Sequence, residues 1–182
     1  MPSRTSPPFR ADHVGSLLRP RALLVARDGH AAGNLSDDEL ADAEDAAITD
    51  VVDLQREAGL QTVTDGEFRR TSWDMDFIYQ LEGVNRTDEQ LEVHFHNADG
   101  DLDFTSAGLG VDGPVRIAKP IFGEAFDFLS SVAPPQMTPK LTIPSPSMVH
   151  YRGGAAAIDP SVYPTRTSSG TTCRRRTPTR CG

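Results

Sequence analysis

The chain lacks most of what an exported or membrane-embedded protein carries. Only two of its 182 residues are cysteines, and both follow residue 172, so the body cannot hold a disulfide framework. No apolar run approaches the ~20 residues that a membrane-spanning helix needs. Residues 1–10 also lack the apolar core of a signal peptide. We therefore expect a cytoplasmic protein with no membrane partner.

Basic residues are scarce until the end of the chain. Residues 165–182 hold five of the 18 basic residues and none of the 26 acidic ones. The first 164 residues therefore carry 13 basic residues against 26 acidic ones, a net charge of −13, whereas the whole chain reads −8. Nucleic acids attract positive charge, so an acidic body of this kind excludes them as partners. The 37% of hydrophobic residues is enough for one domain of ordinary size.

The body alternates between strand and helix patterns. The strongest local signal is the capping box formed by Ser36 and Glu39, followed by apolar residues at helical spacing. The order strand, helix, strand favours a parallel α/β architecture. The expected elements are strands at 11–16, 60–64, 115–122 and 140–143, helices at 36–58 and 124–132, a hairpin of 91–96 with 102–104, and an irregular connection over 17–34.

Two polar segments follow expected strands. Residues 65–70 place two acids and two bases around a glycine, and residues 13–16 contain a Gly-Ser pair. In α/β barrels the loops after the strands build the active site, and a carboxylate there can hold an ammonium group of a substrate or act in proton transfer. Local caps and ion pairs within each loop explain the same residues without a ligand. Both interpretations stay open at this point.

His94 and His96 share one face of the expected hairpin, together with Glu92. Two histidines two residues apart occur in metal sites, but a hairpin with one solvated face explains them more simply. Cys173 and Cys181 match no zinc-module spacing. We predict no metal site from these residues.

Three motifs in register resemble the vitamin B12-independent methionine synthase family, and above all its single-domain members. They are FRADHVGSLLRP at 9–20, TDGEFRR at 64–70 and KLTIPSPS at 140–147, and the resemblance runs from about residue 4 to 164. It implies a TIM barrel that transfers a methyl group from methyltetrahydrofolate to the sulfur of homocysteine. It also implies a zinc ion that holds the thiol as thiolate.

The resemblance also implies substrate-binding residues. Val14, Gly15 and Ser16 match the loop that binds the carboxylate end of homocysteine, and Glu67 matches the glutamate that holds its amino group. Arg116 matches a folate-side contact. His13 and Asp65 adjoin these positions, so we include them as candidate substrate-binding residues. No catalytic residue is assigned.

The likeness stops near residue 164, after about four of the eight βα units of a barrel. The family's zinc ligands, a His-x-Cys pair, a further glutamate and a late cysteine, have no counterpart here. We therefore expect residues 1–164 to form the N-terminal half of a TIM-type α/β barrel with a β-hairpin insertion. Open sheet edges would then favour self-association. For residues 165–182 we hypothesise a tail read in a shifted frame.

Two other functions fit parts of the sequence. A lyase or transferase of the same family acting on another thiol, such as coenzyme M, would use the same chemistry. A non-catalytic remnant or interaction module would instead use the basic tail to bind an acidic partner.

Overall fold

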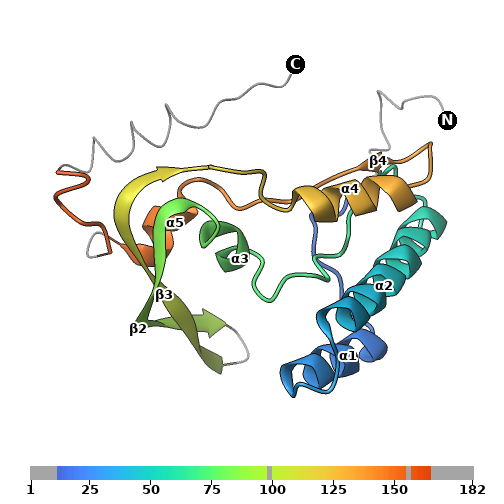
Figure 1. The fold of residues 1–182 in the computed structure, drawn as a ribbon, viewed down its shortest axis with the longest axis horizontal. Helices are drawn as coiled ribbons and strands as arrows, with labels where there is room; N and C mark the ends of the chain where they lie inside the picture. Colours follow the sequence, from blue (N-terminus) through green and yellow to red (C-terminus); the bar gives the residue numbers. More distant parts are fainter. Residues whose placement is uncertain (1–11, 98–99, 155–156, 165–182) are drawn as a thin grey trace. The chain divides into compact units, whose positions relative to one another are not determined.

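The computed structural model of the chain describes residues 12–97, 100–154 and 157–164, with only the backbone of 88–107 and of Gly153. Its fold is α/β, and its elements divide into two compact units. The first unit contains the residues up to Trp73 together with Phe122–Thr142. The second contains Asp74–Ile121 and the residues from Ile143 onward. Figure 1 shows helices α1, α2 and α4 in the first unit and the β2–β3 hairpin in the second.

Helix α2 (Asp37–Glu57) organises the first unit. The amide of Glu39 donates to Ser36 Oγ at 3.2 Å, and the Glu39 carboxylate accepts from the Ser36 amide at 2.8 Å. The predicted capping box and helix are thereby confirmed. The buried face of α2 packs with α1 (Arg21–Ala31) and α4 (Gly123–Val132). The core of this unit consists of Leu23, Ala47, Ile48, Val51, Val52, Val63, Phe68, Leu129 and Met137.

A short parallel strand pair completes the first unit. Strand β1 (Thr62–Val63) lies beside β4 (Thr138–Pro139), with Thr62 opposite Thr138. The pairing continues for one bond, because the Lys140 amide donates to the Val63 carbonyl at 2.8 Å. The predicted parallel arrangement is confirmed for this pair, which α2 and α4 accompany.

The second unit is built on a long antiparallel hairpin. Strand β2 (Glu82–Asn97) pairs with β3 (Gly100–Arg116), with Val93 opposite Phe104 in the register, and the predicted hairpin is thereby confirmed. The hairpin is longer than predicted at both ends. Short helices α3 (Met75–Ile78) and α5 (Met148–Gly153) accompany it. The core of this unit consists of Met75, Ile78, Val84, Leu109, Val111 and Tyr163.

Two expectations for the N-terminal region are wrong. Residues 17–34 are not an irregular connection, because α1 occupies most of them and buries Leu23 and Ala26. The proline and glycine that suggested a break stand at the N-cap and inside the helix. Residues 12–16 form no strand. The carbonyls of Gly15 and Val14 accept hydrogen bonds from the hydroxyl groups of Thr64 and Thr142 rather than from the amides of a neighbouring strand.

Two other strands differ from expectation. Strand β3 ends at Arg116, and the backbone of Phe122 is left-handed (φ 60°) where α4 begins, so 115–122 is not a strand. The strand expected at 140–143 lies at Thr138–Pro139 instead. Among the described residues one pair of strands is parallel and no barrel closes, so the half-barrel remains a prediction.

Candidate functional site

The candidate site begins at the turn that follows β1. Gly66 and Glu67 both adopt left-handed backbone conformations, with φ of 66° and 59°. Glycine enters this region freely, whereas a glutamate there costs on the order of 1 kcal/mol. The Asp65 carboxylate accepts a hydrogen bond from the Glu67 amide at 2.9 Å and so closes the turn. The surrounding chain therefore has to hold Glu67 in a strained conformation.

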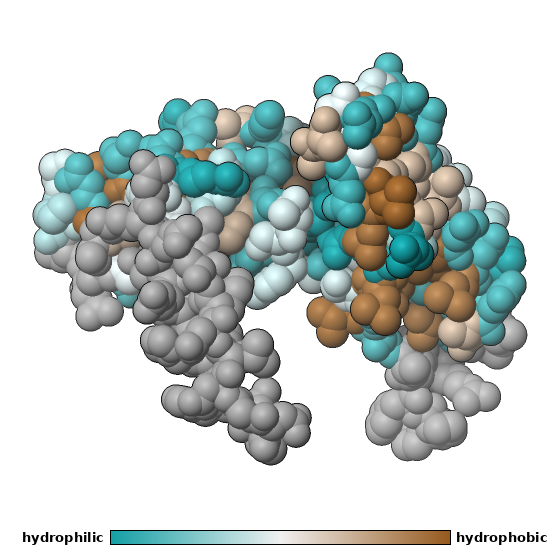
Figure 2. All heavy atoms as spheres, turned by 90° about the horizontal axis from the view of Figure 1, so that it is seen from below, coloured by the Kyte–Doolittle hydropathy of each residue, from teal (hydrophilic) through white to brown (hydrophobic). Residues whose placement is uncertain are grey.

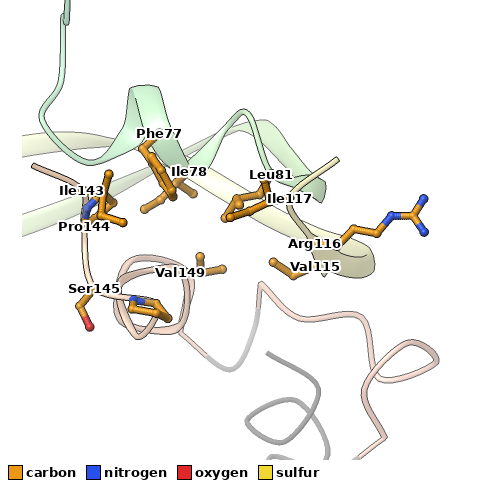
Figure 3. A pocket seen from close by; sticks show the side chains of 11 residues that line it. Phe77, Ile78, Leu81, Val115, Arg116, Ile117, Ile143, Pro144, Ser145 and Val149 are labelled. Atoms are coloured by element: carbon orange, nitrogen blue, oxygen red, sulfur yellow. The ribbon is translucent and has the colours of Figure 1, made fainter. Parts of the chain in front are cut away.

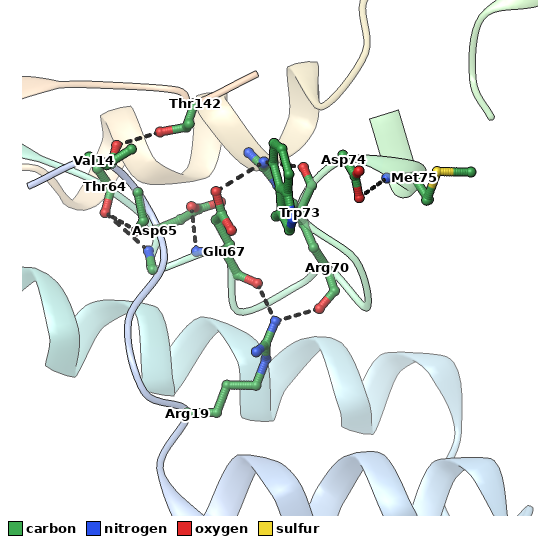
Figure 4. Close-up of polar contacts among 12 residues, drawn as sticks. Val14, Arg19, Thr64, Asp65, Glu67, Arg70, Trp73, Asp74, Met75 and Thr142 are labelled. Carbon is green, nitrogen blue, oxygen red and sulfur yellow. Dashed lines mark hydrogen bonds and ion pairs between the residues drawn. The ribbon is translucent and has the colours of Figure 1, made fainter. Parts of the chain in front are cut away.

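Two arginines hold this turn, one just before α1 and one within it. Arg19 Nη2 donates to the carbonyl oxygens of Glu67 at 2.8 Å and of Arg70 at 2.6 Å (Figure 4). Arg27 Nη1 donates to the same Arg70 carbonyl at 3.2 Å, and its Nη2 pairs with Glu44 of α2 at 2.9 Å. Hydrogen bonds from charged donors are stronger than neutral ones. Residues distant in sequence thus fix the conformation of the turn.

The segment that precedes α1 lies directly against the turn. Thr64 Oγ1 donates to the Gly15 carbonyl at 2.8 Å, and Thr142 Oγ1 donates to the Val14 carbonyl at 2.6 Å. A Cβ atom placed on Gly15 would lie 2.8 Å from Glu67 Oε1 and 2.5 Å from Thr142 Oγ1. Glycine is therefore required for the segment to approach the Glu67 carboxylate this closely.

This segment keeps backbone donors available. The amides of Val14, Gly15 and Ser16 donate no hydrogen bond to any described part of the chain. The next amide, of Leu17, donates to the Gly66 carbonyl at 3.1 Å and anchors the segment. Successive free amides can bind an anionic group. The Glu67 carboxylate thus lies beside Gly15, in a segment whose three amides bond to none of the described residues.

The Glu67 side chain is electrostatically unusual. The residue is 4% exposed, and its burial raises the pKa of its carboxyl above the ordinary value. The Arg70 guanidinium, with Nη1 3.4 Å from Glu67 Oε1, counteracts this rise in pKa, whereas Asp65 adds to it. Arg70 is itself 3% exposed and lies over the Phe122 ring at 4.4 Å. A perturbed buried carboxyl of this kind is typical of functional sites.

Two buried nitrogen atoms near Glu67 lack partners. Arg70 Nη2 and His13 Nε2 make no hydrogen bond to the described residues. A buried polar atom without a partner is unfavourable, and a bound polar ligand is one way to satisfy it. The site therefore offers a guanidinium donor and an imidazole nitrogen as well as a carboxylate.

The structure brings most of the sequence-predicted residues together. Gly15 and Asp65 contact or adjoin Glu67, while Val14 and Ser16 lie in the adjoining segment with exposed side chains. The His13 carbonyl accepts from Lys140 Nζ.

Arg116 belongs to the second unit. It forms an ion pair with Glu82 there, and both side chains are substantially exposed. Its assignment as a folate-side contact stays a prediction.

Several contributors to the site were not predicted as site residues, among them Arg19, Thr142 and Gln55. Gln55 exchanges hydrogen bonds with the backbone of Thr64, at 2.9 Å and 3.0 Å, and so fixes the end of β1. A glutamine on the apolar face of α2 was a usable signal. Arg19 and Thr142 lie within the quoted motifs, but no spacing indicates that they bond to backbone carbonyls far away.

The second unit contains a separate apolar cavity of about 100 Å³. Figure 3 shows the Arg116 guanidinium and the Ser145 hydroxyl extending away from it. Its lining consists of Phe77, Ile78, Leu81, Val115, Arg116, Ile117, Ile143, Pro144, Ser145, Pro146 and Val149.

Neither a metal centre nor a membrane span is visible in the part of the chain that the structure describes. No three or more of its His, Cys, Asp and Glu side chains gather so as to hold a metal ion. None of its helices combines the length and the apolar character needed to cross a bilayer. The side chains of His94 and His96 lie outside the described set.

Curated relatives resemble this chain over most of its length. The uncharacterized proteins YxjG and YxjH of Bacillus subtilis are 41% and 42% identical over 150 and 153 residues, or 82% and 79% of this chain. The chain spans 38% and 37% of the length of these relatives. A methionine synthase of Sulfurisphaera tokodaii is 39% identical over 70 residues, which are 38% of this chain and 21% of that protein. No protein-family model matches the chain.

Solved structures share its fold. A candidate vitamin B12-independent methionine synthase from Listeria monocytogenes is 32% identical, with a TM-score of 0.71, over 93% of this chain and 46% of that one. A B12-independent methionine synthase from a Shewanella species, solved with selenomethionine, is 21% identical, with a TM-score of 0.58, over 90% of this chain and 48% of that one. The structural neighbours are thus methionine synthase-like proteins, and this chain corresponds to about half of each.

Proposed function

We propose that this chain is the substrate-binding part of a cobalamin-independent methyltransferase, with homocysteine as its thiol substrate and methyltetrahydrofolate as methyl donor. The structural neighbours support a methyltransferase-like enzyme at the coarse level. The observation that carries the proposal is that the Glu67 carboxylate lies against Gly15, in a segment where the amides of Val14, Gly15 and Ser16 bond to no described residue. Such a pair of groups is complementary to the ammonium and carboxylate of an α-amino acid.

Each part of the site has a defined task in this proposal. Glu67 binds the substrate ammonium and gives up any proton it holds when the ammonium arrives, because a neighbouring cation favours the ionised carboxyl. The amides of 14–16 bind the substrate carboxylate. Arg19 keeps the Glu67 turn in place through its two carbonyl contacts. These residues orient the amino acid and leave its thiol free to accept the methyl group.

In the family that the motifs resemble, a zinc ion would hold the substrate thiol as a thiolate. The described residues do not fit this ion, since they offer no cluster of three or more suitable side chains. No step of the proposal therefore passes through zinc, and the residues assigned here act only on the amino-acid end of the substrate.

The test is calorimetric titration of the chain with homocysteine and two of its analogues, one without the amino group and one without the carboxylate. In the variant Glu67→Gln we expect at least about tenfold weaker binding of homocysteine, because a charge-assisted contact is lost. The analogue without the amino group should bind both forms alike. Glu57→Gln, an exposed carboxylate on α2, serves as the matched control and should bind homocysteine as the wild type does.

Equal binding of homocysteine by wild type and Glu67→Gln would contradict the proposal, as would no binding at all. Circular dichroism of each variant distinguishes a lost contact from a lost fold. A thiol without an ammonium group, such as coenzyme M, that binds tighter than homocysteine would favour the other thiol chemistry instead.

A further inference from the structure

Helix α1 has two different faces. Leu23 and Ala26 are buried, 1% and 9% exposed, within the first unit. On the opposite side, Leu24 and Val25 remain 47% and 58% exposed. Figure 2 shows apolar surface, in brown, gathered over the part of the molecule that carries the helices of the first unit. The solvent face of α1 therefore presents apolar side chains that no described residue covers.

Two charged residues flank this apolar centre. Arg21 begins α1 and Asp28 lies seven residues later, which is about two helical turns, so both fall on the exposed face. Neither side chain forms an ion pair with another residue that the structure describes. Along the helix axis, the exposed face thus carries a positive charge, then apolar side chains, then a negative charge.

The signs of these charges are unfavourable for α1 alone. A helix favours acidic side chains in its first turn and basic ones in its last turn. Here Arg21 occupies the first position, no acidic residue lies in the first turn, and Asp28 lies near the C-terminal end. The pattern is instead complementary to a second copy of α1 that runs antiparallel. The positive N-terminal end of each helix then lies beside the negative C-terminal end of the other.

We infer that the solvent face of α1 is a self-association surface that pairs with α1 of a second copy, antiparallel and about a two-fold axis. An axis between Leu24 and Val25 places these residues opposite each other at the centre of the pair. It places Arg21 opposite Asp28 of the partner subunit, and the reverse contact follows by symmetry. Such an interface is self-complementary, as a two-fold dimer requires.

One exposed residue outside the helix fits the same arrangement. Leu18, just before α1, is 97% exposed and adds a further uncovered apolar side chain near the N-terminal end of the helix. The helix has only 11 residues, about 16 Å, so the interface is small and its dimer weak and dependent on concentration. This surface is separate from the Glu67 site, so the inference does not depend on the proposed function.

Sedimentation of the full chain over about a hundredfold range of concentration tests the inference. We expect a monomer–dimer equilibrium. Arg21→Asp and Asp28→Arg should each weaken the dimer about tenfold, because either substitution turns both symmetric ion pairs into repulsions. The double variant should restore the wild-type association, because it exchanges the two charges.

These substitutions distinguish a weaker dimer caused by lost contacts at the interface from one caused by a destabilised helix. Each single change improves the match between α1 and its own helix dipole, so weaker association cannot come from a destabilised helix. Val25→Lys should abolish the dimer. Leu54→Lys on α2 is the matched control, since Leu54 is also 58% exposed, and it should leave the dimer unchanged.

A protein that stays monomeric at every concentration would overturn the inference. This holds also if the reason is that further chain covers this face in a longer protein. A dimer that Arg21→Asp does not weaken, or that the double variant does not restore, would overturn it as well. Association through open strand edges would show this second result.

Discussion

Glu67 combines three features that are individually unfavourable to folding. Its backbone is left-handed, its carboxyl is buried with a raised pKa, and its guanidinium neighbour Arg70 keeps one nitrogen unpartnered. The hydrogen bonds from Arg19 to the turn offset this strain. Strain and perturbed ionisation at one residue are typical of a binding or catalytic position.

The raised pKa of Glu67 has a definite consequence for stability. The folded chain holds this proton more tightly than the unfolded chain does, so the resulting stabilisation is complete below the unfolded-state pKa. It is lost as the pH rises through the folded-state pKa. We therefore expect the wild type to lose stability relative to Glu67→Gln across that window, as measured by urea unfolding at a series of pH values.

Glu57→Gln is the control for this measurement, because Glu57 is exposed, and it should follow the wild type at each pH. If the difference in the free energy of unfolding between wild type and Glu67→Gln does not change with pH, the pKa of the Glu67 carboxyl is not perturbed.

Arg19 permits a second prediction at the residue scale. Arg19→Met keeps an unbranched apolar stem but removes two charged hydrogen bonds to backbone carbonyls. We expect a loss of about 1.5–3 kcal/mol in the free energy of unfolding, together with weaker homocysteine binding. Arg56→Met removes only an exposed ion pair with Asp53 and should change stability by less than about 0.5 kcal/mol. Equal losses in the two variants would contradict a role for Arg19 in holding the turn.

At the scale of elements, α2 and the hairpin follow local rules. The α2 start is determined by Ser36 and Glu39, whose reciprocal hydrogen bonds need no distant partner. The Glu39 carboxylate accepts hydrogen bonds from the Ser36 amide and the Ser36 hydroxyl, and these two bonds hold the pKa of Glu39 below its ordinary value. Strand β1, in contrast, is only two residues long and exists through its pairing with β4.

The capping box leads to a prediction for α2. Ser36→Ala removes the acceptor for the Glu39 amide and should lower the free energy of unfolding by about 1 kcal/mol. Chemical denaturation measures this change. Ser130→Ala in α4 is the control, since the Ser130 hydroxyl bonds only to the carbonyl of Phe126 within its own helix. A loss from Ser130→Ala as large as that from Ser36→Ala would show that capping is not the cause.

At the scale of the whole molecule, the described residues form two hydrophobic cores in two units. Ile48 lies in the core of the first, at 0% exposed, and Leu109 in the core of the second, at 4% exposed. No residue belongs to the buried set of both cores. Cores without shared members need not open together.

Substitution in each core tests this division. Ile48→Ala should lower stability by about 2–5 kcal/mol and speed amide hydrogen exchange in α2 and β1, because it leaves a cavity. Leu109→Ala should have its main effect on the backbone of β2 and β3. Equal acceleration of exchange in both units by either variant would show that the chain opens as one cooperative body.

The sequence by itself determined what depends on neighbouring residues. It predicted α2 from its cap and apolar spacing, the hairpin from its alternation, and a polar loop at 65–70 after the expected strand. Tertiary structure decided the rest. Residues 12–16 form no strand, because side chains of Thr64 and Thr142 bond to their carbonyls.

Long-range contacts also made α1 a helix and placed Arg19 beside the turn. Leu23 and Ala26 gain their burial from packing within the unit, which outweighs the proline and glycine signals. Arg19 lies 48 residues before Glu67, whose carbonyl it holds. Caps and tight turns act over three or four residues, whereas burial and backbone clamps join residues that only the folded chain brings together.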